Sequence, residues 1–157
     1  HGGPIDIIVH NAGITRDKLL ANMNEGQWDA VLAVNLLAPA VLTRELLPHL
    51  REAHGTVVFV NSGAGLTAHP EWAAYAASKH GLKALADSLR AEEPDVRVTT
   101  VYPGRTATAM QEKVHGQQGK DYDAADWIQP DTVARTILHV LDLSRDATLT
   151  DVTVRPS

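Results

Sequence analysis

A tyrosine and a lysine stand four positions apart in the run Tyr75-Ala76-Ala77-Ser78-Lys79. On a helix, residues four apart share one face, so the phenol and the ammonium are neighbours. An unperturbed tyrosine titrates near pH 10, and a cation within about 4–6 Å favours the phenolate and lowers the pKa. The pair therefore predicts a tyrosine that transfers protons near neutral pH. A chance spacing on an ordinary helix is the alternative that this short motif leaves open.

Two further polar residues stand where chemistry would need them. Ser62 follows the apolar run 57–60, thirteen residues before Tyr75. Its hydroxyl is placed to hydrogen-bond a substrate oxygen, and a turn-forming serine among glycines is the alternative. Asn35 lies in the apolar stretch 34–37, where a buried amide needs a partner. A helix kink or a core hydrogen bond is the alternative for Asn35.

These residues belong to a chain in which apolar strand-like runs alternate with helix-like stretches. The pattern predicts strands at 5–9, 57–60, 96–101 and 149–154, helices at 24–50, 70–91 and 130–141, and a mobile loop at 114–126. Each strand is a continuous apolar run rather than an alternation, which is typical of a parallel sheet buried on both faces. We therefore expect an α/β fold with helices on both faces of the sheet.

Three of the predicted strands end in clusters of small or polar residues, at 11–13, 61–65 and 103–108. In open α/β sheets, ligands bind beyond the carboxyl ends of the strands. Three clusters at one edge of the sheet therefore predict one site. The run Gly63-Ala64-Gly65 lacks the Lys-Ser/Thr of a phosphate-binding loop, so we interpret it as a turn beside that site.

Composition excludes several other classes of protein. The 157 residues are 44% hydrophobic and 21% charged, with a net charge of -5 and no cysteine. One core is expected, with no disulfide scaffold and no thiolate site, in a protein of the cytoplasm. An acidic chain without a basic patch predicts no nucleic-acid partner, and no apolar run is expected to reach the roughly 18 residues of a membrane span. The eight histidines do not show metal-ligand spacing, so no metal is expected.

Together these motifs resemble the short-chain dehydrogenase/reductase family. The motifs that carry the resemblance follow one another over nearly the whole chain: Asn11-Ala12-Gly13, Asn35, Ser62, Tyr75-x-x-x-Lys79 and Pro103-Gly104. Segments 14–17 and 28–35 look most like the 3-oxoacyl-carrier-protein reductase branch, whereas 105–110 looks less like it. The resemblance implies a Rossmann-type doubly wound parallel sheet, with residues 1–157 as the carboxyl-terminal part of a single domain.

The same resemblance implies a role for each candidate catalytic residue. Tyr75 is expected to protonate a carbonyl oxygen as hydride arrives, and to act as base in the reverse direction. Lys79 is expected to lower the pKa of Tyr75 and to hold the nicotinamide ribose. Ser62 is expected to orient the carbonyl, and Asn35 to bind a water that links Lys79 to solvent. The function implied is an NAD(P)(H)-dependent oxidoreductase that reduces a small-molecule carbonyl or oxidises a secondary alcohol.

Cofactor contacts follow in the same way. The residues expected to touch the dinucleotide, besides Tyr75 and Lys79, are Asn11, Ala12, Gly13, Pro103, Gly104, Thr106 and Thr108. The branch resemblance favours NADP(H) over NAD(H). The family pairs its long helices across a subunit interface, which implies a homodimer or homotetramer.

Two departures from the family pattern qualify these expectations. His10 stands where the family usually has a second asparagine, and a histidine that ends a buried strand is typical of a hydrogen-bonded core residue. The Gly-x-x-x-Gly-x-Gly turn that would hold a pyrophosphate is absent, so we expect about 70 further residues to precede the chain. A non-catalytic fragment that serves binding or oligomerisation is the alternative function, and an epimerase or dehydratase is an alternative within enzymes.

Overall fold

The computed structural model describes residues 3–119 and 121–157. Within them, four strands form one parallel sheet in the order β1-β2-β3-β4. The strands are β1 (Ile7–His10), β2 (Thr56–Val60), β3 (Arg97–Pro103) and β4 (Asp151–Val154). The predicted parallel sheet is confirmed, and the observed strand bounds differ from the predicted ones by a few residues.

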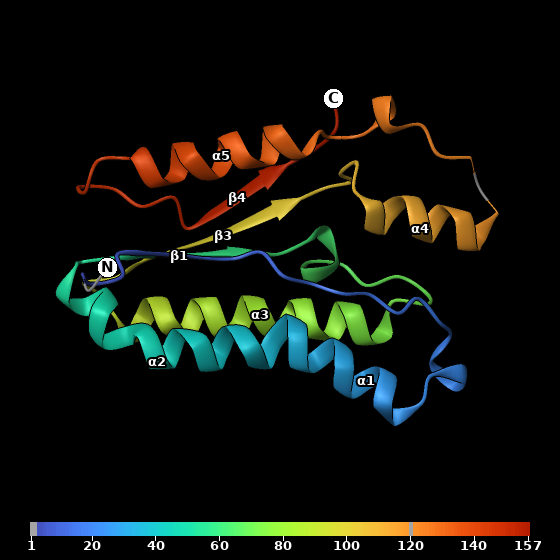
Figure 1. Cartoon of the computed structure of the whole chain (residues 1–157), viewed down its shortest axis with the longest axis horizontal. Helices are drawn as coiled ribbons and strands as arrows, with labels where there is room; N and C mark the ends of the chain where they lie inside the picture. Colours follow the sequence, from blue (N-terminus) through green and yellow to red (C-terminus); the bar gives the residue numbers. More distant parts are fainter. Residues whose placement is uncertain (1–2, 120) are drawn as a thin grey trace.

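Helices cover both faces of this sheet (Figure 1). One face carries α1 (Glu25–Leu32), the π-helical turn η2 (Ala33–Leu37), α2 (Ala38–Glu52) and α3 (Ala73–Glu92). The other face carries α5 (Pro130–Asp142), while α4 (Ala109–Gln118) lies beyond the tip of β3. Three short 3-10 turns complete the described elements: η1 (Leu20–Asn22), η3 (Gly63–Gly65) and η4 (Ala124–Asp126).

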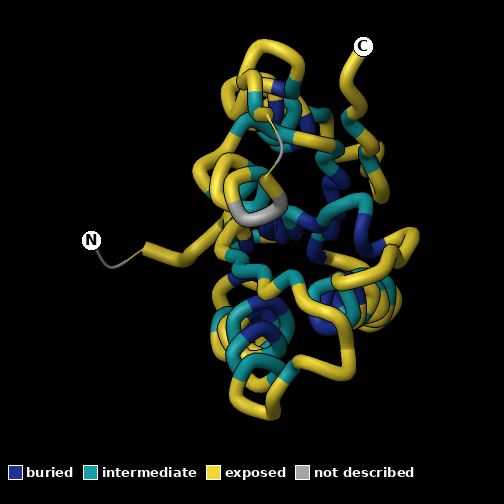
Figure 2. The backbone as a smooth tube through the Cα atoms, turned by 90° about the vertical axis from the view of Figure 1, so that its right-hand side faces the viewer, coloured by how far each residue is buried: buried dark blue, intermediate teal, exposed yellow. Residues whose placement is uncertain are grey.

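Two apolar clusters hold the layers together. The larger cluster lies between the sheet and the helices α2 and α3, and its fully buried members include Leu50, Phe59, Leu82 and Val98. The smaller one joins Val58 and Val101 to Val140 of α5. Figure 2 shows the buried residues along the middle of the molecule and the exposed residues on the outer helix faces and loops. The continuous apolar character of β2 therefore reflects burial on both of its faces.

One continuous helical segment, Glu25–Glu52, differs from what the sequence predicted. The segment has 28 residues, and an 18-residue window within it has a mean hydropathy of 1.6, so it is long and apolar enough to cross a membrane by length and composition alone. The expectation that no segment meets this standard was therefore wrong. The core helix of a protein without a membrane passes the same test, and this segment contributes Val31, Asn35 and Leu50 to the protein interior.

The segment predicted as a mobile loop is also partly helical. Helix α4 starts after Thr108, whose hydroxyl accepts a hydrogen bond from the Gln111 N–H at 3.4 Å, and ends at Gly119, whose φ of 63° is left-handed. Thr and Gly in these positions are ordinary start and stop signals for a helix. The Gly/Gln-rich composition concealed a short helix with a weak apolar stripe.

Candidate active site

A cavity of about 550 Å³ opens at the carboxyl ends of the strands. Ser62, two residues after the end of β2, lines it together with Tyr75 and Lys79 from the first turns of α3. The structure therefore brings together the three side chains whose types and spacing predicted chemistry. A cleft of this size, mostly apolar with a few convergent polar groups, is typical of a small-molecule site.

Lys79 is almost completely buried, with 4% of its surface exposed. Its ammonium donates a hydrogen bond to the backbone carbonyl of Val60 at 3.1 Å and lies 5.8 Å from the centre of the Tyr75 ring. Burial lowers the pKa of Lys79 to about 8, because removal from water disfavours the charged form. A cation with this pKa gains or loses its proton close to neutral pH.

The pKa of Tyr75 moves in the direction opposite to the predicted one. Burial of the phenol raises it, the Ser62 hydroxyl opposes the rise, and the charge of Asp17 adds to it. The prediction that this pKa is lowered was wrong, since desolvation dominates. The phenol of Tyr75 is accordingly neutral near pH 7 and carries a proton that it can donate.

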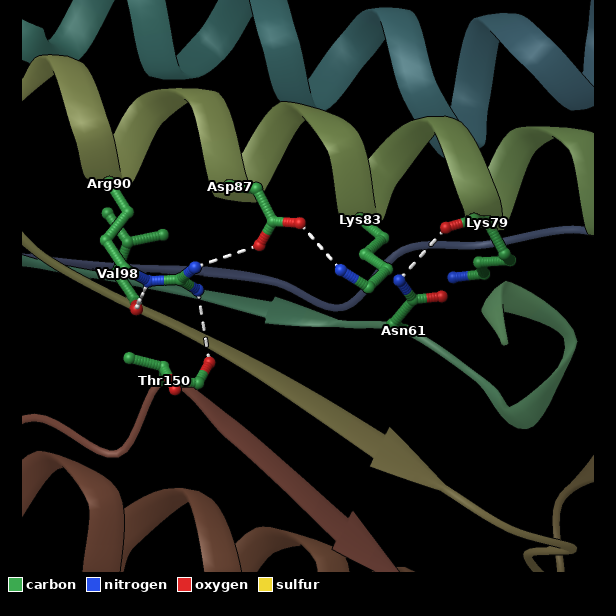
Figure 3. A network of polar contacts seen from close by, with 7 residues as sticks. All are labelled: Asn61, Lys79, Lys83, Asp87, Arg90, Val98 and Thr150. Atoms are coloured by element: carbon green, nitrogen blue, oxygen red, sulfur yellow. Dashed lines mark hydrogen bonds and ion pairs between the residues drawn. The ribbon is translucent and has the colours of Figure 1, made fainter.

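Asn61 organises the site, although the sequence singled it out only as one member of a cluster. Its Nδ2 donates to the carbonyl of Lys79 at 3.0 Å (Figure 3). Its Oδ1 accepts from the N–H of Ser62 at 2.9 Å. One buried amide thus joins the end of β2 to the helix that carries Tyr75. An asparagine directly before the serine at a strand end was the available signal.

Helix α3 is also fixed to the sheet farther along its length. Arg90 donates to the carbonyl of Val98 in β3 and to that of Thr150, each at 3.1 Å (Figure 3). Asp87 accepts from Arg90 at 2.9 Å and from Lys83 at 2.6 Å. These contacts hold α3 against the sheet and so help to fix the positions of Tyr75 and Lys79 on the same helix, as a preorganised site requires.

Asn35 lies behind the cavity and does not line it. It is 1% exposed, exchanges two hydrogen bonds of 2.8 Å with the backbone of Ile14, and donates to the Ser78 hydroxyl at 3.1 Å. It sits in the π-helical turn η2, four residues before Pro39, which has no N–H to donate to the Asn35 carbonyl. Both alternatives named for Asn35, the helix irregularity and the core hydrogen bond, are therefore present.

Most of the residues expected to bind a cofactor line the same cavity. Its walls include Asn11, Gly13, Pro103, Gly104, Thr106 and Thr108, whereas Ala12 is not among them. A Cβ at Gly13 would lie 3.6 Å from Oδ1 of Asn35 and 3.7 Å from Nζ of Lys79. Gly13 thus keeps the backbone beside the ammonium free of a side chain.

His10 is a core residue, as its place at the end of a strand indicated. Its Nε2 is 2.8 Å from the Thr43 hydroxyl of α2, and its ring stacks on Phe59 with centroids 5.0 Å apart. Burial lowers the pKa of His10 to about 4. In residues 3–119 and 121–157, no three His, Asp or Glu side chains gather as a metal site.

Known proteins resemble this chain in sequence and in fold. The family profile described as short chain dehydrogenase matches residues 1–119. Nodulation protein G of Rhizobium sp. is 40% identical over 124 residues, which are 77% of this chain and 51% of that protein. The 3-oxoacyl-(acyl-carrier-protein) reductase FabG of Thermotoga maritima is 40% identical over 115 residues, 71% of this chain and 47% of that protein.

Solved structures agree in fold along almost the whole chain. The oxidoreductase yciK of E. coli is 30% identical with a TM-score of 0.87, covering 98% of this chain and 63% of that one. A 4-hydroxyisoleucine dehydrogenase complexed with NADH is also 30% identical, with a TM-score of 0.78, covering 95% of this chain and 66% of that one. The chain spans about half the length of the curated relatives it matches.

Proposed function

Because the chain belongs to the short-chain dehydrogenase/reductase family, we propose that it is the carboxyl-terminal part of a single-domain oxidoreductase that uses a nicotinamide cofactor. The reaction is reduction of a small-molecule carbonyl, or oxidation of a secondary alcohol, by hydride transfer. The observation that carries this proposal is the convergence of Ser62, Tyr75 and Lys79 on one cavity at the carboxyl ends of the strands.

The residues around the cavity fit a nicotinamide nucleotide. The ammonium of Lys79 lies beside Gly13, which has no side chain to block the space next to it. Gly104 and Thr106, after the end of β3, line the same cavity. Among the described residues, the ammonium has one hydrogen-bond acceptor, the carbonyl of Val60, so further donors remain for ribose hydroxyls. A bound nicotinamide supplies the hydride.

Each catalytic side chain then has one task. Ser62 donates a hydrogen bond to the substrate carbonyl and orients it. Tyr75, neutral because burial raises its pKa, donates the proton to the same oxygen. Lys79 holds the ribose and, as a neighbouring cation, stabilises the phenolate that remains on Tyr75.

Asn35 provides the route by which Tyr75 recovers its proton. Both side-chain atoms of Asn35 are used in holding Ile14 and Ser78. In an α-helix the Asn35 carbonyl would accept a hydrogen bond from the N–H of residue 39, but Pro39 has none. The carbonyl can therefore accept a hydrogen bond from a water near Lys79. We assign to this carbonyl the water that connects Lys79 with solvent.

NADP(H) is the proposed cofactor in preference to NAD(H), on the resemblance to the 3-oxoacyl-carrier-protein reductase branch. Solved relatives carry either nucleotide: one alcohol dehydrogenase is complexed with 5-hydroxy-NADP and the 4-hydroxyisoleucine dehydrogenase with NADH. We expect kcat/KM to be higher with NADPH than with NADH.

The protein is further proposed to act in the cytoplasm as a homodimer or homotetramer. Leu37 and Leu42, which are exposed on the surface of the helical segment Glu25–Glu52, are proposed to lie at the subunit contact.

The test is Tyr75→Phe, which removes only the phenolic oxygen. We expect carbonyl reduction to fall by about 10²–10⁴-fold while NADPH binding, followed by nucleotide fluorescence, is retained. Tyr102→Phe is the matched control, because the Tyr102 hydroxyl is buried in β3 without a partner among the described residues. Full turnover by Tyr75→Phe, or no turnover by the wild type with any nicotinamide nucleotide, contradicts the proposal; the second result favours a non-catalytic module.

A further inference from the structure

We propose that the carbonyl substrate carries an anionic group, held by Arg16 and Lys113 in a second cavity beside the catalytic one. This inference rests on the proposed function and adds the chemical class of the substrate. The second cavity measures about 610 Å³ and lies between the loop 14–18 and the first turns of α4. None of its lining residues had been assigned a role in catalysis or in cofactor binding.

The two cavities adjoin each other, because the Met110 side of α4 lines both. Asp17, which lines the second cavity, is close enough to Tyr75 for its charge to affect the phenol. A substrate with its carbonyl at Tyr75 therefore has its far end among the residues of the second cavity.

The lining of the second cavity is distinguished by its positive charge. Three of its residues are cationic, Arg16, Lys18 and Lys113, against the single carboxylate of Asp17. Asp17 accepts a hydrogen bond from the Thr15 hydroxyl. Within 3–119 and 121–157, none of the three cations forms an ion pair. Unpaired cations on a concave wall attract a negatively charged ligand.

The two cations we single out come from opposite sides of the cavity. Arg16 lies on a loop that Asn35 holds through two hydrogen bonds to Ile14, and its Nη1 donates to the Thr15 carbonyl at 2.8 Å. The guanidinium has further N–H donors in a fixed fork, the geometry that matches carboxylate and phosphate oxygens. Lys113 faces it from α4, one turn after Met110. An anion between them joins the loop to α4.

A binding experiment tests this without relying on turnover. The chain has two methionines, so labelling the methionine methyl groups gives one NMR signal in the cavity, from Met110, and one reference signal from Met23. Glutarate is the anionic probe and dimethyl glutarate its neutral counterpart. We expect glutarate alone to shift the Met110 signal in a saturable way, with Met23 unchanged.

Variants identify the groups that hold the anion. Arg16→Gln with Lys113→Gln should raise the apparent Kd for glutarate by about tenfold to a hundredfold, the usual effect of losing charge-assisted hydrogen bonds. Arg44→Gln with Arg135→Gln, two exposed cations outside the cavity, is the charge-matched control. Equal shifts with dimethyl glutarate, no saturable shift, or an unchanged Kd in the double variant would each overturn the inference.

An activity measurement separates this inference from the proposed function. With NADPH, 5-oxohexanoate should be reduced with a kcat/KM at least about tenfold above that of its methyl ester, and the double variant should lose this preference. Equal rates for acid and ester refute the anionic class while leaving the reductase intact. If neither of these compounds nor any other ketone is reduced, the reductase function is refuted. The NMR titration then decides on its own whether the anion site exists.

Discussion

Asn61 at the end of β2 donates a hydrogen bond to the backbone carbonyl of Lys79 in α3, with Nδ2 and the carbonyl oxygen 3.0 Å apart. Its Oδ1 accepts from the N–H of Ser62. The spacing between the serine hydroxyl and the helix that bears the tyrosine and lysine is thus determined by a buried amide. The side chains that we propose to touch the substrate are therefore held in place by an amide whose two hydrogen bonds both stay within the protein.

Replacing that amide should disturb both stability and catalysis. Asn61→Ala leaves the Ser62 N–H and the Lys79 carbonyl without their side-chain partner, so we expect a loss of about 1–3 kcal/mol in the free energy of unfolding. Because the positions of Ser62 and Lys79 both depend on it, kcat should fall more than KM rises. Chemical denaturation and steady-state kinetics measure the two effects. Asn22→Ala, at an exposed position, is the control and should stay within about 0.5 kcal/mol of wild type.

Two glycines in the turn η3 offer a sharper comparison. A Cβ added at Gly65 would lie 2.9 Å from Cγ and 3.0 Å from Nδ2 of Asn61, whereas a Cβ added at Gly63 would meet nothing within 4 Å. Gly65→Ala should therefore displace the Asn61 amide and reproduce the kinetic defect of Asn61→Ala, while Gly63→Ala leaves kcat unchanged. If both alanine variants behave alike, the proposed importance of the Asn61 position is wrong.

The order of the elements and the members of the site were predictable because both follow from local patterns. Apolar runs without alternation indicated parallel strands, of which β2 and β3 are buried while the edge strands β1 and β4 are partly exposed. The small or polar residues after the strands indicated the ligand edge, where Ser62, Gly13 and Gly104 line one cavity. The spacing of Tyr75 and Lys79 drew attention to them, and the resemblance to the family gave them their expected roles. These signals need no knowledge of distant contacts.

What escaped prediction depends on tertiary packing. The direction of the Tyr75 pKa shift is decided by burial beneath other segments, which outweighs the neighbouring charge expected from spacing. A core hydrogen bond was one alternative named for Asn35, but its partners Ile14 and Ser78 lie 21 and 43 residues away and could not be identified from the sequence. Helix α4 was missed because its composition is polar, so its start at Thr108 carried the only strong signal.

His10 should make the protein less stable in acid. Its pKa is about 4 in the folded state, against an ordinary value of 6.5. Between these values the unfolded chain binds a proton that the folded chain does not, so stability falls as the pH drops from about 6.5 to about 4. The loss should reach about 2 kcal/mol at pH 4.5.

The measurement is the free energy of unfolding at pH 7 and pH 4.5 for wild type and His10→Gln. The variant should lose less stability between the two pH values than wild type, while His139→Gln, at an exposed position on α5, should follow wild type. Other groups contribute to the pH dependence in all three proteins and cancel in the comparison. Parallel pH profiles for wild type and His10→Gln would contradict this assignment.

Lys79 should be a residue that catalysis needs and stability does not. Its ammonium is buried with one hydrogen bond, to the Val60 carbonyl, and its pKa is lowered from 10.5 to about 8. At neutral pH the folded protein therefore holds a charge that burial disfavours. Lys79→Met removes that penalty at the loss of one hydrogen bond, so we expect activity to disappear while the free energy of unfolding at pH 7 rises by about 1–2 kcal/mol.

The sign of the pH dependence provides an independent check. Between about pH 8 and 10.5, the unfolded wild type keeps a proton on Lys79 that the folded protein has released, so wild-type stability rises with pH relative to Lys79→Met. Lys83→Met is the control, since the Asp87 carboxylate raises the pKa of Lys83 and its removal should not stabilise the protein. A Lys79→Met variant less stable than wild type at pH 7 would show that the ammonium supports the fold, and the site would then owe its geometry to Lys79 as well as to Asn61.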